Sequence, residues 1–319
     1  MQAKSSSIKR LIEKIGSACK FVEVQFVSEQ LNVVLESSME CLNCQSTKIE
    51  TRPKGKFAVA EFCSQCFKVC NNCEGVGYTF QKDELGREIA DRCACQDLQL
   101  RMTLFNKAQI PSQFYDSTFE NFDVGSNSSI KSAWNTAKFS FKNYKSGKGK
   151  GLLFMGGVGV GKTRLVSTML REYTLKYGIP SLFKEFTSLL SEIKSGYDKG
   201  FSESIILEKI GEVEILVIDE LGKGRKSDWE ITILDSIISS RYNMKKTTIF
   251  TTNYTDKKST TFAETFTMRM GKDGMEEVER KETLKQRVHS RIYSRLKEMC
   301  DFIEMKGTDY RYPKTEYAG

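Results

Sequence analysis

A glycine-rich loop in the middle of the chain constrains the fold more than any other feature. The apolar run from Leu152 to Met155 predicts a short buried strand, and the next eight residues, Gly156 to Thr163, read GGVGVGKT before a helical pattern begins. This is the G-x-x-x-x-G-K-[ST] pattern in the strand, loop and helix setting that gives it meaning. Backbone N–H groups of such a loop converge on a phosphate where the helix dipole also favours negative charge. The sequence therefore predicts a nucleotide site in an α/β fold.

The residues of this loop have separable roles. Lys162 is expected to reach the β- and γ-phosphates of ATP, and the Thr163 hydroxyl is expected to bind Mg²⁺. The rest of the loop is expected to bind phosphate through its backbone: Gly156, Gly157, Val158, Gly159, Val160 and Gly161. The alternative is a glycine-rich turn without a ligand, and the lysine and threonine argue against it.

An acidic pair follows the loop at a distance of 56 residues and ends a second apolar run. Four consecutive apolar residues precede Asp219 and Glu220, as expected of a central parallel strand that is covered on both faces. Ligands bind at the carboxyl edge of such sheets. Asp219 is therefore expected to hold Mg²⁺ through water, and Glu220 is expected to polarise the water that attacks ATP. The predicted activity is hydrolysis of ATP to ADP and phosphate.

The size and charge of the chain set wide limits. Its 319 residues, of which 39% are hydrophobic, suffice for one large core with a small module beside it. The net charge of +8 suits a polyanionic partner but is also common in proteins that bind none. No apolar run approaches the roughly 20 residues that span a bilayer, and the first residues contain no signal-peptide core. We expect a cytoplasmic protein that has no membrane partner.

Eight of the ten cysteines form four close pairs, which predict metal binding. The gaps between successive pairs are eighteen, three and nineteen residues. Two pairs complete the four-sulfur shell of a structural Zn²⁺ site, so two zinc ions would use all eight thiols. Sequential pairing is the simplest arrangement, although an interleaved one is also compatible with the spacing. The expected ligands are Cys41, Cys44, Cys63 and Cys66 at one ion and Cys70, Cys73, Cys93 and Cys95 at the other.

Two other interpretations of the cysteines are less favoured. Four thiolates also hold iron–sulfur clusters, but ribbon-like spacing with glycine turns favours zinc. The stretch from Cys70 to Gly77 resembles one repeat of the zinc domain of DnaJ-type chaperones, but only one copy is present. Because all eight thiols would be coordinated, the metals are expected to fold the segment and not to catalyse.

Beyond the cysteines, two short motifs make a resemblance specific. Ala108 to Phe114 reads AQIPSQF, and Thr118 to Phe122 reads TFENF. Cysteine pairs followed by these motifs, a helix and the phosphate loop resemble the DnaC/DnaI family of replicative helicase loaders. In that family these linker residues lie against the ATPase domain near the base of the nucleotide, and packing of their aromatic rings into the core is an equal alternative here.

The resemblance implies an AAA+ ATPase with a central parallel sheet and no C-terminal helical lid. The polar tip of the strand that begins at Thr247 then corresponds to sensor 1, the residue that positions the lytic water, which is Asn253 here. The family usually has T-S-N where this chain has T-T-N. The family's S-R-L motif implies that Arg295 is the arginine finger that reaches a neighbouring subunit's ATP, with Arg291 in reserve. The closing G-x-D-Y-R motif is present from Gly307.

The residues themselves give a further reason to look at these arginines. Arg287, Arg291 and Arg295 are spaced by four residues, which places all three on one helical face. Like charges so close together repel unless an anion lies nearby. A solvated basic face or a contact with the DNA backbone is the alternative to an arginine finger.

The expected organisation has five parts. They are an N-terminal helical and partner-binding segment (1–40), a zinc module (41–96), a linker with the first helix of the ATPase region (97–146), the AAA+ ATPase domain (147–312) and a tail (313–319). A polar, charged insertion is expected at 255–283. In related loaders a helical insertion before the acidic strand touches single-stranded DNA, and here it would include Lys194, Tyr197 and Lys199.

The resemblance implies an ATP-dependent DNA helicase loader that acts in DNA replication. Its expected partners are a replicative DNA helicase, single-stranded DNA and further copies of itself, joined through ATP at their interfaces. Its expected cofactors are ATP, Mg²⁺ and two Zn²⁺ ions. One alternative is an IstB-like ATPase that assists a transposase on double-stranded DNA. Another is a zinc-dependent adaptor that binds ATP and hardly hydrolyses it.

Overall fold

The computed structural model describes most of the chain from residue 41 onward. The N-terminal helical and partner-binding segment expected at 1–40 lies outside the described residues. The described ranges are 41, 43–45, 47–147, 150–198, 200, 202–256, 266–270, 276–280 and 282–311. Among them, no helix is both long and apolar enough to cross a membrane.

A five-stranded parallel sheet lies at the centre of the region that contains the phosphate loop, as predicted. Its strand order is β11-β5-β8-β7-β6, so the strand before the phosphate loop has β11 on one side and β8 on the other. The acidic strand β7 lies next to β8, and their carboxyl ends meet at the same edge. The strands are β5 (Gly151–Gly156), β6 (Ser181–Glu185), β7 (Ile215–Asp219), β8 (Thr247–Thr252) and β11 (Cys300–Met305). The predicted AAA+ α/β class is confirmed.

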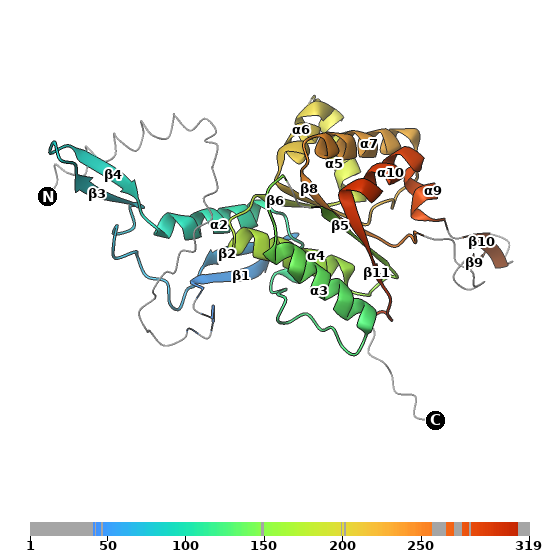
Figure 1. Ribbon diagram of the computed structural model, residues 1–319, viewed down its shortest axis with the longest axis horizontal. Helices are drawn as coiled ribbons and strands as arrows, with labels where there is room; N and C mark the ends of the chain where they lie inside the picture. The colour runs from blue at the N-terminus through green and yellow to red at the C-terminus, as the bar shows by residue number, and fades with distance from the viewer. Residues whose placement is uncertain are drawn as a thin grey trace. The chain divides into compact units, whose positions relative to one another are not determined.

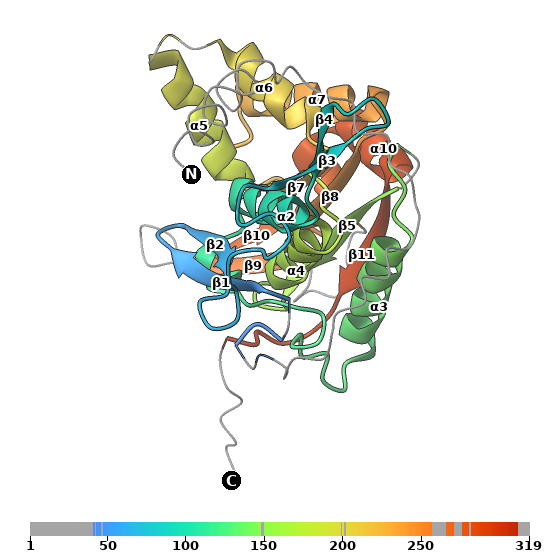
Figure 2. The ribbon, with the colours of Figure 1, turned by 90° about the vertical axis from the view of Figure 1, so that its left-hand side faces the viewer.

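Helices cover both faces of this sheet (Figures 1 and 2). Alternate residues of β5 point to opposite faces, so Leu152 and Phe154 join one core and Leu153 and Met155 join the other. The first core contains α2 (Cys95–Lys107), α3 (Ser128–Lys142) and α4 (Lys162–Leu175). The second contains α5 (Phe186–Asp198), α6 (Glu203–Glu212), α7 (Asp228–Asn243), α9 (Leu284–Val288) and α10 (Ser290–Met299). Burial on both faces explains why β5 and β7 read as continuous apolar runs.

Side-chain caps fix where several of these helices begin. Asn127 accepts hydrogen bonds from the N–H groups of Ser129 and Ile130 at the start of α3. Ser227 accepts from the N–H of Glu230 at the start of α7. These oxygens satisfy N–H groups that have no partner within the helix, which defines the first turn.

Antiparallel hairpins account for the remaining described strands. The cysteine-rich region contains β1 (Ile49–Lys54) paired with β2 (Phe57–Phe62), and β3 (Tyr78–Lys82) paired with β4 (Glu88–Arg92). The insertion expected at 255–283 contains a hairpin of β9 (Phe266–Met270) and β10 (Glu276–Arg280). Several other residues of that insertion lie outside the described part of the chain.

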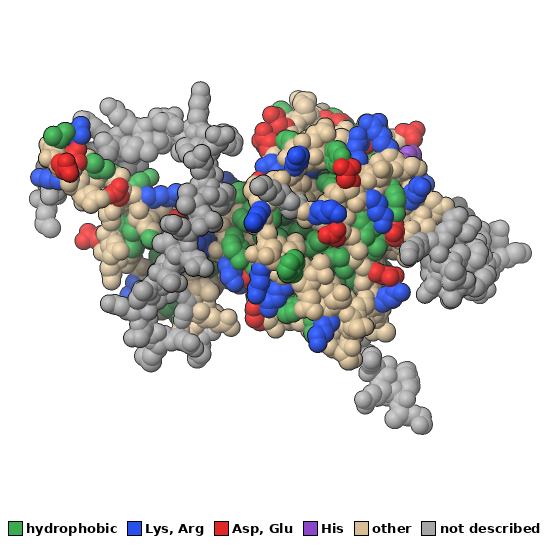
Figure 3. Space-filling view, viewed as in Figure 1, with side chains coloured by type: hydrophobic (Ala, Val, Ile, Leu, Met, Phe, Trp, Pro, Cys, Tyr) green, Lys and Arg blue, Asp and Glu red, His purple; other side chains and the backbone are tan. Residues whose placement is uncertain are grey.

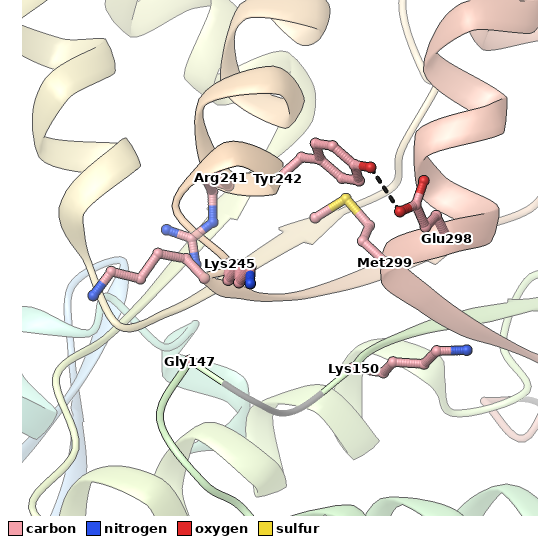
Figure 4. Close-up of a pocket in the computed structure, with 8 residues that line it drawn as sticks. Gly147, Lys150, Arg241, Tyr242, Lys245, Glu298 and Met299 are labelled. Carbon is pink, nitrogen blue, oxygen red and sulfur yellow. Dashed lines mark hydrogen bonds between the residues drawn. The ribbon is translucent and has the colours of Figure 1, made fainter.

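A fully buried arginine fastens the amino edge of the sheet to two helices. Arg241, in α7, is 0% exposed, and its guanidinium donates hydrogen bonds to six acceptors in the end of α6, the connection to β7 and the start of β8. Burial lowers its pKa to about 10. Figure 4 shows Arg241 beside Lys245 at a pocket where the Tyr242 hydroxyl donates to Glu298. The acceptors are the carbonyl oxygens of Ile210, Gly211, Val213, Glu214 and Thr247 and the hydroxyl of Thr248.

This arrangement yields a prediction about stability. The Arg241→Ala variant leaves buried carbonyl oxygens without donors, so it should lower the free energy of unfolding by roughly 3–5 kcal/mol. Urea denaturation followed by circular dichroism measures the change. Lys142→Ala, at an exposed position of α3, is the control and should change stability by less than about 0.5 kcal/mol. Equal stability of the two variants would contradict the anchoring role of Arg241.

Candidate nucleotide and metal sites

The phosphate loop connects the end of β5 to the start of α4, and glycines are required at two of its positions. Gly156 has φ +154°, and a Cβ there would lie 2.1 Å from the carbonyl oxygen of Met305. Gly159 has φ +76°, and a Cβ there would lie 1.9 Å from the carboxylate of Asp309. Only glycine allows both the backbone conformation and these close approaches. The loop therefore packs closely against the C-terminal part of the described chain.

Lys162, the first residue of α4, lies folded over the loop. Its ammonium donates to the carbonyl oxygens of Gly156 (2.9 Å) and Gly157 (2.6 Å) and to Oδ1 of Asn253 (2.7 Å). The residue is 7% exposed, and this burial lowers the pKa of its amine to about 8, although Asp219 and Glu220 act in the opposite direction. The structure thus brings together the lysine of the loop and the predicted sensor 1 residue.

The predicted magnesium-binding residues lie in direct contact. The Thr163 hydroxyl donates to Oδ1 of Asp219 at 3.0 Å, and the Thr251 hydroxyl donates to the same oxygen at 2.5 Å. Asp219 is 5% exposed, and burial raises its pKa while these two hydrogen bonds oppose the shift. A hydroxyl and a carboxylate are the oxygen ligands that Mg²⁺ prefers, so these residues fit the ion.

Glu220 follows Asp219 in a left-handed backbone conformation, with φ +56°. Its N–H donates to the hydroxyl of Thr251 at 3.0 Å, which holds the turn after the strand. Its carboxylate forms an ion pair with Lys223, whose ammonium also lies 3.8 Å from Glu185. Its negative charge also acts to raise the pKa of the Lys162 amine. That Glu220 polarises the attacking water remains a prediction.

Sequence reasoning missed two contributors to this site. Thr251 anchors both acidic residues, yet in the sequence it appeared only as the first residue of the T-T-N motif, and no role was predicted for it. The second contributor is the closing G-x-D-Y-R motif, which was recognised in the sequence without a prediction of where it lies. Its Tyr310 N–H donates to the carbonyl oxygen of Gly159 at 3.1 Å, and the charge of Arg311 contributes to the low pKa of Lys162.

The linker motifs lie against the start of α4. Phe119 and Phe122 are buried in the first core, in agreement with the packing alternative. Phe122 also approaches the loop, since a Cβ at Gly161 would lie 3.3 Å from its ring. Arg164 donates to the carbonyl oxygen of Asn121 at 3.0 Å. Proximity to a nucleotide base remains a prediction.

The three arginines do not share a helical face, so that expectation was wrong. His289 has φ +66° and separates α9 from α10, which turns Arg287 away from the other two. Arg287 donates to the carbonyl oxygen of Gly222 at 2.5 Å and so braces the loop after the acidic strand. Carboxylates of the same chain lie near Arg287, as they do near Arg291 and Arg295, and they relieve the repulsion between these positive charges.

Arg295 and Arg291 both face Asp235 of α7. Arg295 lies 2.7 Å from its carboxylate and is 24% exposed, whereas Arg291 lies 3.7 Å away and is 73% exposed. If Arg295 serves another subunit's ATP, its guanidinium must leave Asp235 to contact the phosphate. If Arg291 does so, its exposed side chain needs only to extend away from the protein surface. The role of an arginine finger stays a prediction for both.

The cysteines converge in the sequential arrangement. The four sulfur atoms of each group lie within 4.8 Å of one another. The shortest contacts are 3.3 Å between Cys44 and Cys66 and 3.5 Å between Cys73 and Cys95. Zn–S bonds of about 2.3 Å in a tetrahedron separate sulfurs by about 3.8 Å, so both groups fit a zinc ion. The groups are Cys41, Cys44, Cys63, Cys66 and Cys70, Cys73, Cys93, Cys95.

The first cysteine group is joined to the helices that cover the central sheet. The side chain of Asn106, in α2, exchanges hydrogen bonds with the backbone N–H and carbonyl of Ala60 in β2, at 2.6 Å and 3.1 Å. Arg171, in α4, donates to the Thr51 hydroxyl of β1 at 2.7 Å. The β1–β2 hairpin that carries these contacts begins and ends beside the first group of cysteines.

These contacts predict different consequences for the two metal groups. Cys44→Ser and Cys73→Ser should each reduce bound zinc from two ions to one per chain, measured by mass spectrometry of the eluted metal. Cys44→Ser should also lower the melting temperature of the core around the central sheet by several degrees, because it loosens the hairpin that contacts α2 and α4. Cys73→Ser is the matched control and should leave that transition in place. The reverse order of effects would contradict the bracing role.

The buried lysine predicts a pH dependence of nucleotide binding. With a pKa of about 8 in the nucleotide-free protein, Lys162 is charged at pH 7 and mostly neutral at pH 9. Phosphate favours the charged amine, so ATP affinity is nearly full at pH 7 and should fall up to about tenfold between pH 7 and pH 9. Calorimetry in two buffers of different ionisation enthalpy should show proton uptake on binding at pH 8.5. Lys162→Met should bind more weakly without this uptake; uptake in that variant would exclude Lys162 as its source.

The chain has relatives among known proteins. DnaC of Escherichia coli K12, a replicative helicase loader, is 28% identical over 150 residues, 47% of this chain and 60% of DnaC. The uncharacterised protein YqaM of Bacillus subtilis is 24% identical over 160 residues, 47% of this chain and 50% of YqaM. The chain thus spans only about half of the length of these relatives.

Among solved structures, a DnaC helicase loader has 28% identity and a TM-score of 0.49, with 61% of this chain and 99% of that one covered. A structure of DnaI has 22% identity and a TM-score of 0.46, with 62% and 93% covered. The family described as IstB-like ATP binding protein matches residues 78–268, well over half of the sequence. The chain therefore belongs to the IstB-like family of ATP-binding proteins, to which the DnaC/DnaI resemblance had pointed.

Proposed function

We propose that this protein is an ATP-hydrolysing loader of a hexameric DNA helicase in replication, a cytoplasmic role that uses single-stranded DNA as the site of delivery. The observation that carries the ATPase part is the convergence of Lys162, Thr163, Asp219, Glu220 and Asn253 at one edge of the sheet. The similarity to DnaC supports the helicase part.

In the proposed reaction, Lys162 leaves the loop carbonyls and pairs with the β- and γ-phosphates. Bound Mg²⁺, held at Thr163 and Asp219, would supply charge neutralisation between the phosphate oxygens. Asn253, released from Lys162, would orient the attacking water. Glu220 would accept the proton from that water once its carboxylate separates from Lys223.

Assembly is proposed to complete the site. Arg295, or the more exposed Arg291, would stabilise charge on the γ-phosphate of an adjacent subunit. Zinc at the two cysteine groups would keep the N-terminal module folded, and residues 1–40 with that module would contact the helicase. The insertion that carries Lys194 and Tyr197 would contact DNA; its Lys199 lies outside the described residues. Lys194 now lies over the ring of Trp229, with its ammonium 4.6 Å from the ring centre.

One related alternative has support, because the matching family is named for IstB. An ATPase that assists a transposase would prefer double-stranded DNA, which a binding assay at fixed salt distinguishes. A zinc-dependent adaptor would retain ATP without turnover.

The proposal predicts the behaviour of a catalytic variant. Glu220→Gln should still bind ATP with about wild-type affinity but should hydrolyse it at least about 100-fold more slowly, because the amide cannot accept the proton. Phosphate release with and without single-stranded DNA measures this, and DNA should stimulate only the wild-type protein. Glu212→Gln, which changes a carboxylate in α6 away from the loop, is the control. Unchanged turnover in Glu220→Gln, or no stimulation by DNA, would contradict the proposal.

Mixing variants tests whether the arginine acts between subunits. Arg295→Ala and Glu220→Gln should each be inactive alone, yet their mixture should recover part of the activity. Interfaces would then form in which Glu220 of one subunit meets Arg295 of another. The same mixture made with Arg291→Ala identifies which arginine is used. Co-purification with a replicative helicase, dependent on the zinc module, tests the loader role.

A further inference from the structure

The outer face of α3 combines a solvent-exposed aromatic ring with lysines. Ala137 and Phe141 belong to the buried stripe of the helix, whereas Phe139 lies about 200° around the helix from either and is 70% exposed. Lys131, Lys138 and Lys142 follow one flank of the same helix, because they are spaced by seven and four residues. These four residues, Lys131, Lys138, Phe139 and Lys142, are called the α3 surface below.

The charge of the α3 surface is not balanced within its own helix. The sequence contains no aspartate or glutamate between Asp123 and Glu172, and six lysines fall in residues 131–150. None of the three lysines forms an ion pair with a residue that the structure describes. The negative charge of Glu172 on α4 interacts with Lys138, but the carboxylate of Glu172 lies 3.9 Å from the ammonium of Lys176, which balances that charge. The β11 carboxylates Asp301 and Glu304 likewise have lysines nearby.

The α3 surface rests on a fixed support. Asn127, which caps the helix, also donates to the carbonyl oxygen of Lys306 at 2.7 Å, and Ser129 donates to that of Glu304 at 2.8 Å. The Trp134 indole donates to the carbonyl oxygen of Phe119 at 3.1 Å, and its ring lies 4.4 Å from the ammonium of Lys138. The ring and the charges are therefore presented on a rigid helix, on the face where Figure 3 shows Lys and Arg side chains at several points.

We propose that the α3 surface binds a single DNA strand, with a base stacked on Phe139 and the phosphates following the flank of lysines. From Lys131 to Lys142 the helix rises roughly 16 Å, so its charges can contact several phosphates. An exposed aromatic ring within a basic surface is the combination that binds single strands without regard to sequence. A protein-docking face would need a contiguous apolar patch, and Phe139 is the only large apolar side chain on this side of α3 that is described as exposed.

This inference rests on the proposed binding of single-stranded DNA, but it concerns different residues. The insertion with Lys194 and Tyr197 belongs to α5, which covers the opposite face of the sheet from α3. Two contact regions on one subunit would hold a longer strand than either holds alone. The experiment must therefore separate the α3 surface from the insertion.

The test measures binding of a fluorescein-labelled dT20 oligonucleotide by anisotropy, without nucleotide, over a range of salt concentrations. Phe139→Ala should weaken binding by about 5- to 100-fold, since one stacked base is lost. Lys131→Gln combined with Lys142→Gln should reduce the slope of log K against log salt by about 1.4. The matched control, Lys54→Gln with Lys82→Gln, removes the same charge at exposed positions of the cysteine-rich hairpins and should change neither quantity.

Stacking has its own readout. Phe139→Trp should retain the affinity of the wild-type protein, and dT20 should quench its added emission by more than it quenches the emission of Trp134 and Trp229 in the wild-type protein. Circular dichroism of all variants should match that of the wild-type protein, because the substituted side chains lie outside the core. Unaltered emission of the added tryptophan on binding would overturn the stacking contact.

The outcomes separate the two proposals. If the wild-type protein binds no dT20, both the strand-binding part of the proposed function and the α3 surface fail. If the wild-type protein binds, Lys194→Gln weakens binding and the α3 variants bind like the wild-type protein, the α3 surface alone fails. If the double-stranded form binds as tightly as dT20 and Phe139→Ala has no effect, a stacked single strand is likewise excluded.

Discussion

The nucleotide site depends on one buried carboxylate. Asp219 is 5% exposed, and a charge in that position is tolerated only if donors surround it. The donors come from Thr163 at the start of α4 and Thr251 near the end of β8. The same Thr251 accepts the N–H of Glu220, so the loop, the acidic strand and the sensor strand are joined by a short chain of hydrogen bonds. These hydrogen bonds fix where Thr163, Asp219 and Glu220 lie relative to one another.

The features that the sequence predicted well are those with a repeating physical signal. The strands β5 and β7, which are buried on both faces, read as continuous apolar runs. The phosphate loop is defined by glycines because its backbone conformation allows no other residue at Gly156 and Gly159. The cysteine pairs predicted two four-sulfur groups, with sequential grouping as the simplest arrangement; the sulfur positions agree with it, although the spacing had left an interleaved arrangement open. In these cases the local pattern and the three-dimensional arrangement have the same cause.

The features that the sequence did not predict depend on distant partners. The continuous helix expected through Arg287 and Arg295 is broken because His289 adopts a left-handed conformation, which spacing does not reveal. The pairing of Arg295 with Asp235 joins residues 60 positions apart. Arg241 resembles a surface residue in the sequence, yet it is fully buried because carbonyl groups from several segments converge on it. Such contacts follow from the fold and cannot be derived from local pattern.

The order of the strands has a consequence for synthesis of the chain. The strand β11, which pairs with β5, follows the phosphate loop by about 150 residues in the sequence. Gly156 and Gly159 of the loop lie against Met305 and Asp309. The loop therefore emerges from the ribosome long before the residues that shape it. A nascent chain with a complete phosphate-loop sequence would still lack its supporting strand. The capacity to retain nucleotide should thus be acquired late, when β11 has been released and has joined the edge of the sheet.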